Sequence, residues 1–244
     1  MTVLILSPVP RGEQPAVAAA LMGYESVHAE QAGFFEPATI PGARARLQMA
    51  GGEFCGNAAM SLAAWLAREG GVTDGEIPLE ISGAAEIVRC RVRLAEDGIY
   101  RCALGMPLPA TLETACGFPV VRLPGIAHAI VEGADVDAES LVRRIADATN
   151  EEAAGVILLS PTDLAMRPLV YVPAAGSMVW ERGCGSGTAA VGAYLALKRG
   201  ADVDLSIRQP GGVITVRAAC GDGKIAALAI EGGVRIVAEG IAHI

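Results

Sequence analysis

The sequence predicts an α+β protein built from two pseudo-symmetric halves. Two observations predict this class. Strand-like and helix-like segments alternate along the 244 residues, and one cysteine-containing motif occurs twice at a fixed spacing. With 52% hydrophobic and 19% charged residues, the chain can form a sizeable core, which argues against extensive disorder. The length suits one large domain or two domains of ordinary size.

Each element is predicted from its own pattern. Segments with β-branched residues and alternating polarity are expected to be strands, and they are 3–7 (VLILS), 87–94 (IVRCRVRL), 156–160 (VILLS) and 168–173 (PLVYVP). Two segments rich in Ala and Leu, 58–68 and 188–198, are expected to be helices. A third helix is expected over 137–149, opened by Asp137 with Ser140 in its first turn.

An internal repeat indicates how these elements are grouped. Residues 55–58 (CGNA) match residues 184–187 (CGSG), 129 positions later. At the same offset AWLA matches AYLA, Gly71 matches Gly200, and Gly83 matches Gly212. One ungapped offset through helix, loop and strand is typical of a duplicated unit. We therefore expect halves 1–113, carrying Cys55, and 114–244, carrying Cys184, with the last residues free to cross back to the first half.

Net charge and hydropathy indicate which kinds of molecule the protein does not bind. The net charge of −8 and the scattered basic residues argue against binding to a nucleic-acid backbone. No apolar run approaches the roughly 18 residues that a membrane span needs. The first residues lack a basic segment ahead of their short apolar run, so no signal peptide is expected and a cytoplasmic location is predicted. The predicted partner is a small molecule.

The six cysteines are expected to be reduced in such a chain. None has the C-x-x-C spacing of a zinc site, so no metal is expected. Most cysteines simply pack in a core, and this is the expectation for four of them: Cys90, Cys102, Cys116 and Cys220. The repeated glycine context sets Cys55 and Cys184 apart.

Both of these cysteines precede a predicted helix. A helix N-terminus presents unpaired N–H groups and the positive end of the helix dipole, which favours a carboxylate ligand and lowers a thiol pKa. Two such cysteines could serve as a thiolate that removes an α-proton and a thiol that protonates the opposite face. The sequence therefore predicts inversion at a carbon beside a carboxylate.

The motifs carry a family resemblance. GGEFCGNAAM with ERGCGSGTAA resembles the signature pair of the diaminopimelate epimerase and proline racemase superfamily, and QPGG and IVAEG resemble its later strands. Within the superfamily, EFCGNAAMS, EQAGFFE and PLVYVP leading into WERGCGSGTAA resemble the histidine racemases of staphylopine-type metallophore biosynthesis. The resemblance implies the diaminopimelate epimerase-like fold, in which each half is a mixed, mainly antiparallel sheet wrapped around a central helix. It also implies catalysis without pyridoxal phosphate or another cofactor.

The resemblance implies roles for individual residues. Cys55 and Cys184 correspond to the acid/base pair. Other positions correspond to residues that hold the α-carboxylate (Gly56, Asn57, Gly185, Ser186), that line the cysteines (His128, Glu181), or that lie near the substrate side chain (Glu30). A carboxylate at Glu30 suits an imidazole or imidazolium.

Two departures from the superfamily pattern bear on the substrate. The first loop reads PRGEQP over residues 10–15, where the superfamily has Gly-Asn. Gln14 could serve there as the amide donor, or Glu13 and Arg11 could mark another side-chain preference. Arg182 stands two residues before Cys184, which argues against a role in gripping the distal carboxylate of diaminopimelate.

The leading prediction is a cofactor-independent amino-acid racemase that converts L-histidine to D-histidine and feeds opine-metallophore biosynthesis. A homodimer is left open. The alternatives are an epimerase or racemase of another amino acid, of the diaminopimelate or hydroxyproline type, and a non-catalytic protein that binds a carboxylate.

Overall fold

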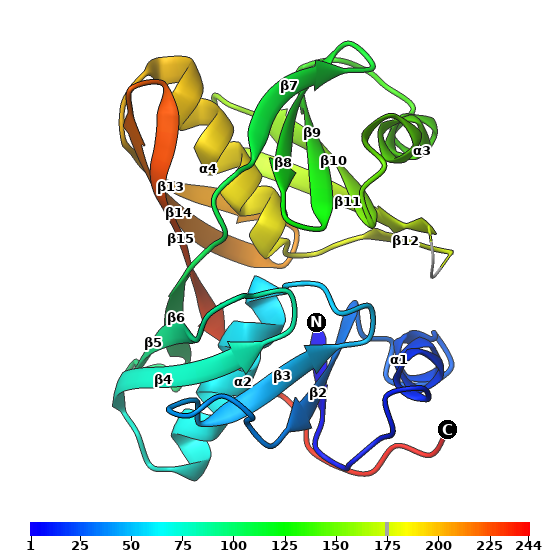
Figure 1. Ribbon diagram of the computed structural model, residues 1–244, viewed down its shortest axis with the longest axis vertical. Coiled ribbons are helices and arrows are strands. Elements are labelled where there is room, and N and C mark those ends of the chain that lie inside the picture. Colours follow the sequence, from blue (N-terminus) through cyan, green and yellow to red (C-terminus); the bar gives the residue numbers. More distant parts are fainter. Residues whose placement is uncertain (174–175) are drawn as a thin grey trace. The chain divides into compact units, whose positions relative to one another are not determined.

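The computed structural model describes residues 1–173 and 176–244. They form two compact units (Figure 1). Unit 1 comprises Met1–Gly105 and Glu231–Ile244, and unit 2 comprises Met106–Ile230. The expected boundary between residues 113 and 114 divides the chain by its sequence repeat, whereas these units are defined by spatial compactness. The expected boundary therefore stays a prediction.

Unit 1 contains a mixed sheet whose strands follow one another in sequence order. The β1/β2 and β3/β4 pairs are parallel, and the other neighbouring pairs are antiparallel. The strands are β1 (Thr2–Ile5), β2 (Gln31–Glu36), β3 (Ala45–Met49), β4 (Asp74–Ile81), β5 (Val88–Leu94) and β6 (Tyr100–Gly105).

Helix α2 (Gly56–Glu69) is the centre of unit 1, because it contacts all six of these strands. Its alanines are buried and let the strands approach closely: Ala58, Ala59, Ala63, Ala64 and Ala67. Helix α1 (Gln14–Met22) packs instead on β2. There Ala18 joins Ala32 and Phe34 in a small apolar cluster.

Unit 2 repeats this plan with a second helix. Its sheet runs β14-β13-β11-β10-β9-β8-β7, with β12 paired to β11. The β9/β10 and β11/β13 pairs are parallel, and the other neighbouring pairs are antiparallel. The strands are β7 (Thr111–Ala115), β8 (Phe118–Leu123), β9 (Ile126–Glu132), β10 (Ala153–Ser160), β11 (Ala165–Val172), β12 (Ser177–Trp180), β13 (Val203–Gln209) and β14 (Gly212–Gly221). Strand β15 (Lys224–Val234) then carries the chain back into unit 1.

Helix α4 (Gly185–Arg199) is the counterpart of α2 and packs against β8, β9, β13 and β14. Helix α3 (Ala138–Thr149) packs against β7, β9, β10 and β11. The side chain of Asp137 accepts the Ser140 N–H at 3.1 Å, so the predicted start of α3 is confirmed.

The backbone keeps the 129-residue offset. Helices α2 and α4 begin at Gly56 and Gly185, and Gly71 and Gly200, which follow them, share a φ of +64°. Gly83 and Gly212 both have positive φ, at hairpin turns. The predicted α+β class, with mixed, mainly antiparallel sheets around central helices, is confirmed.

The predicted strands and helices are confirmed with small changes at their ends. Helix α1 was not predicted, although Pro15 in its first turn and the alanines that follow are typical of a helix start. None of the helices among the described residues is both long and apolar enough to span a membrane.

Candidate active site

Cys55 and Cys184 occupy matching positions, each as the N-cap of the central helix of its unit. Their backbones are nearly identical, with φ −128° and ψ 106° at Cys55 and φ −121° and ψ 112° at Cys184. This extended conformation is typical of an N-cap, beyond which the first N–H groups of the helix lack intrahelical partners. Each cysteine therefore stands beside a group of backbone donors.

In unit 2 the sulfur of Cys184 lies within a set of short polar contacts. Sγ accepts the Gly187 N–H at 3.2 Å and lies 3.5 Å from Ser186 Oγ. A Cβ at position 187 would lie 3.1 Å from this sulfur and 2.8 Å from Ile157 Cδ1. Glycine at 187 thus lets the helix backbone approach the thiol.

His128 extends these contacts into the core of unit 2. Its Nε2 lies 3.0 Å from Ser186 Oγ, and the residue is fully buried on β9. Gly155, its register partner on β10, leaves room for the ring, because a Cβ there would lie 2.1 Å from Nδ1.

Burial lowers the pKa of His128 to about 4, so the ring is neutral near pH 7. Among the described residues Nδ1 has no hydrogen-bond partner, so a proton there would have no acceptor. A proton on Nε2 instead donates to Ser186, whose own hydroxyl hydrogen can then turn toward the Cys184 sulfur.

The pKa of Cys184 is raised, contrary to the direction expected from the helix N-terminus. Burial is the main cause, followed by the negative charge of Glu181 and a hydrogen bond with that side chain. Ser186 and the Gly187 N–H act in the opposite direction and are outweighed. Cys184 is therefore a thiol in this structure. The free-energy cost of burying a thiolate exceeds the stabilisation that the two hydrogen bonds, from Ser186 and the Gly187 N–H, would give it.

In unit 1, Cys55 follows a loop that is held from the β4–β5 turn. Ser82 Oγ accepts the Met49 N–H at 3.0 Å and donates to the Glu53 carbonyl at 2.9 Å. A Cβ at Gly83, where φ is +75°, would lie 2.5 Å from Phe54 N. The turn therefore fixes the two residues that lead into Cys55.

The remaining predicted residues of unit 1 lie in ionic contacts of their own. The Glu30 carboxylate is 3.0 Å from the N-terminal ammonium of Met1. Gln14 is the first residue of α1 rather than a loop residue, and its Nε2 donates to Glu36 Oε1 at 2.9 Å and to the Val9 carbonyl at 3.3 Å. To bind substrate, Gln14 would have to release one of these bonds.

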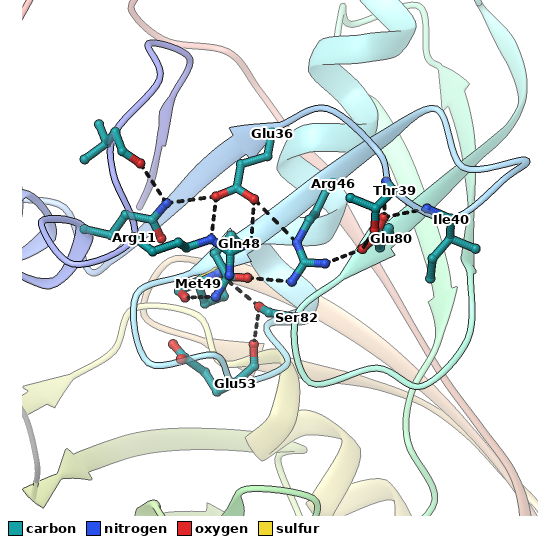
Figure 2. Close-up of polar contacts among 12 residues, drawn as sticks. Arg11, Glu36, Thr39, Ile40, Arg46, Gln48, Met49, Glu53, Glu80 and Ser82 are labelled. Carbon is teal, nitrogen blue, oxygen red and sulfur yellow. Dashed lines mark hydrogen bonds and ion pairs between the residues drawn. The ribbon is translucent and has the colours of Figure 1, made fainter.

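Figure 2 shows that Glu36 and Glu80 are linked through Arg46. Arg11 donates from two nitrogens to Glu36, at 2.9 and 2.6 Å, and Arg46 contacts both carboxylates. Burial opposes charge on Glu80, but hydrogen bonds from Thr39, Ile40 and Arg46 lower its pKa to about 2. This network ties the start of α1 to β2, β3 and β4.

The structure thus gathers four predicted residues in unit 2: Cys184, Ser186, His128 and Glu181. In unit 1, Gly56 and Asn57 follow Cys55 in the first turn of α2, whereas Glu30 and Gln14 belong to β2 and α1 contacts. Sequence reasoning missed Gly155, Thr188 and Gln209, which contact His128 or Cys184. The motifs that contain two of them, ERGCGSGTAA with Thr188 and QPGG with Gln209, were the available signals.

Similarity to known proteins extends over nearly the whole chain. The family model described as "Histidine racemase CntK N-terminal domain" matches residues 1–243. The histidine racemase of Staphylococcus aureus is 28% identical, covering 100% of this chain and 94% of that protein. The histidine racemase of Fusobacterium nucleatum subsp. nucleatum is 31% identical, covering 94% and 88%. The structure of a probable proline racemase from Agrobacterium radiobacter, with bound carbonate, superposes with a TM-score of 0.64 at 16% identity, covering 98% and 90%.

The family model and the curated relatives define the chain as an isomerase of the racemase and epimerase class, with the fold seen in the proline racemase structure. The chain covers nearly the whole length of the racemases to which it is similar. It belongs to the histidine racemase family.

Proposed function

We propose that the protein interconverts L- and D-histidine without a cofactor, with Cys55 and Cys184 as the two bases. The observation that carries the proposal is the duplicated N-cap cysteine, with matching backbone angles, in a chain of the histidine racemase family. Inversion of a stereocentre needs one group to remove the α-proton and another to protonate the opposite face. A repeated cysteine at equivalent positions supplies a pair of such groups.

The protonation state of Cys184 supports a division of labour. Its raised pKa suits the thiol that donates a proton to the substrate carbon. Cys55 would then be the base that removes the proton. After one turnover the roles are exchanged, and the enzyme is set for the other enantiomer.

The substrate carboxylate is assigned to the first turns of α2 and α4. Gly56 and Asn57, and Gly185 and Ser186, are the first residues of the two helices. N–H groups at this position bind anions and stabilise the charge that develops on the carboxylate when the α-proton leaves. Fixed donors perform this better than water, because they need no reorganisation.

His128 and Glu181 are assigned to tuning Cys184, through Ser186 and through direct charge respectively. Glu30 is proposed to recognise the imidazole, as its correspondence to the family suggests, and it would then exchange the Met1 ammonium for the ligand. The Gln14 amide is proposed to bind substrate as well, by releasing Glu36 or the Val9 carbonyl. A cytoplasmic location, a dimer and supply of D-histidine for opine-metallophore synthesis also remain proposals.

The test is chiral analysis of histidine incubated with the purified protein in D2O, without pyridoxal phosphate. We expect L-histidine and D-histidine to reach a racemic mixture, with deuterium at Cα. Cys55→Ser and Cys184→Ser should each lower kcat by at least about 10²-fold, the usual contribution of a positioned acid or base. Cys220→Ser, a thiol on β14, is the matched control and should keep full activity. Absence of exchange with histidine, or a fully active Cys55→Ser or Cys184→Ser variant, would contradict the proposal.

A further inference from the structure

The Gln-Pro-Gly-Gly motif of the sequence forms the tight turn between β13 and β14, where Gln209 pairs with Gly212. The turn touches the segment before Cys184 at two points. Gly211 N–H donates to the Arg182 carbonyl at 2.6 Å, and the Cys184 N–H donates to Gln209 Oε1 at 2.7 Å. A Cβ at position 211 would lie 2.9 Å from the Arg182 carbonyl oxygen, so glycine permits this approach.

The side chain of Gln209 then continues to the other side of the same cysteine. Its Nε2 donates to Thr188 Oγ1 at 2.8 Å, and Thr188 Oγ1 donates to the Cys184 carbonyl at 2.6 Å. Three hydrogen bonds thus close a ring that starts at the N–H of Cys184 and ends at its carbonyl. We call this set of Cys184, Gln209 and Thr188 the backbone ring.

The direction of each bond in the backbone ring is determined. Thr188 has one hydroxyl hydrogen, and the Cys184 carbonyl can only accept it. Thr188 Oγ1 must therefore accept from the NH₂ group of Gln209, which leaves the amide oxygen of Gln209 for the Cys184 N–H. Thr188 is fully buried, so water does not compete for its hydroxyl group.

The residues at the matching positions of the first half cannot form the same ring. At the 129-residue offset Thr188 corresponds to Ala59, which has no hydroxyl, and Gln209 corresponds to Glu80. The Glu80 carboxylate binds Thr39, Ile40 and Arg46 instead.

From these contacts we propose that Gln209 and Thr188 are positioning residues for Cys184, which hold its backbone so that Sγ lies against the Gly187 N–H and the Ser186 hydroxyl. The role rests on the proposed function, in which this sulfur exchanges a proton with the substrate carbon. Proton transfer is sensitive to placement, and a shift of about 1 Å can lower a rate by about 10²-fold. Neither side chain is assigned a contact with the substrate.

The variants Thr188→Val and Gln209→Leu remove the hydroxyl and the amide while keeping a side chain of similar size. We expect kcat for histidine racemisation to fall by about 10-fold or more, with KM changed by less than about threefold. Thr188→Ser restores the hydroxyl and should recover most of kcat. Ser206→Ala is the matched control, because it removes an exposed hydroxyl bond to Thr215 on the same hairpin.

A second readout does not depend on racemisation. The rate of alkylation by iodoacetamide is measured against pH for the Cys55 and Cys184 peptides separately, by mass spectrometry. Loss of the ring moves Sγ away from the Gly187 N–H. The pH at which alkylation of Cys184 is half-maximal, its midpoint, should therefore rise by about half a pH unit or more, while the corresponding pH for Cys55 stays the same. If Thr188→Val is too unstable to assay, Gln209→Leu alone decides, because it removes both hydrogen bonds of the amide without adding a charge.

The outcomes are separable. If the wild type racemises no amino acid, the proposed function fails, and the alkylation profiles still decide on the backbone ring. The inference is overturned if Thr188→Val and Gln209→Leu leave the Cys184 midpoint unchanged or lowered. Equal shifts at both cysteines, or a Thr188→Ser variant as impaired as Thr188→Val, would also overturn it.

Discussion

Replacing Gly155 with alanine tests the packing of His128 while leaving the side chains of His128 and Cys184 themselves unchanged. The added Cβ would lie 2.1 Å from Nδ1, 2.6 Å from Cε1 and 3.2 Å from Cγ of the His128 ring. Ordinary contacts begin near 3.4 Å, so the ring must move by more than 1 Å. The displacement is directed away from β10, and it disturbs the 3.0 Å contact between Nε2 and Ser186 Oγ.

The magnitude follows from overpacking in a filled core. Forcing extra volume into a well-packed site lowers the free energy of unfolding by about 1–3 kcal/mol, and a disturbed hydrogen bond adds about 1 kcal/mol. In a chain of this size each kcal/mol lowers Tm by about 2–4 °C. Because Ser186 contacts the Cys184 sulfur, we also expect kcat to fall by about 10-fold or more.

The assay combines thermal unfolding with the rate of histidine racemisation below the melting transition. Gly221→Ala is the matched control, since this glycine lies at the end of β14 with no atom within 4 Å of the added Cβ. If Gly155→Ala melts at the temperature of Gly221→Ala and keeps its kcat, the tight packing of His128 and its link to Ser186 are refuted.

Other consequences can be measured in the same way. The folded-state pKa of His128 is lowered by burial from 6.5 to about 4, so its contribution to stability is complete above pH 6.5 and is lost as pH falls to 4. Between these pH values the free energy of unfolding, measured with urea, should fall by about 3 kcal/mol in the wild type, and this fall should vanish in His128→Asn. If His128→Asn keeps the same dependence of stability on pH, a neutral buried ring is contradicted. Hydrogen bonds lower the pKa of Glu80 from 4.5 to about 2 despite burial, so its contribution is present above pH 4.5 and lost between 4.5 and 2. In Glu80→Gln the free energy of unfolding should depend less on pH in that acidic range. A variant that keeps the wild-type dependence on pH would rule out Glu80 as its source. Gly83→Ala places a side chain at φ +75° and 2.5 Å from Phe54 N, so we expect unfolding to become easier by more than about 1 kcal/mol and kcat to fall; wild-type values for both would show that the turn does not hold the loop before Cys55.

Much of the fold was accessible from the sequence because the protein uses simple patterns. Alternating apolar residues predicted strands such as β10, and the alanine-rich segments after Cys55 and Cys184 predicted the central helices. The constant offset between the two cysteines predicted matching backbones, and their φ and ψ values agree within about ten degrees. Because the motif is repeated, the local structure inferred around one cysteine also applied to the other.

The features that could not be predicted depend on contacts distant in sequence. The helix N-terminus suggested a lowered thiol pKa at Cys184, but burial and Glu181 act more strongly, and burial is a property of the packed unit. The use of the Gln14 amide by Glu36 depends on how α1 packs against β2. The relation of Gly155 to His128 required the register of two parallel strands separated by a helix.

The unlike surroundings of Cys55 and Cys184 have a consequence for how such an enzyme can change. The backbone has the same shape at both cysteines, whereas Gln209 and Thr188, which hold Cys184, are replaced by Glu80 and Ala59 at the matching positions of the first half. Substitutions around Cys184 can therefore change the acidity of its thiol while the thiol of Cys55 keeps its own. The duplication repeats the backbone around the cysteine without repeating the side chains at the matching positions.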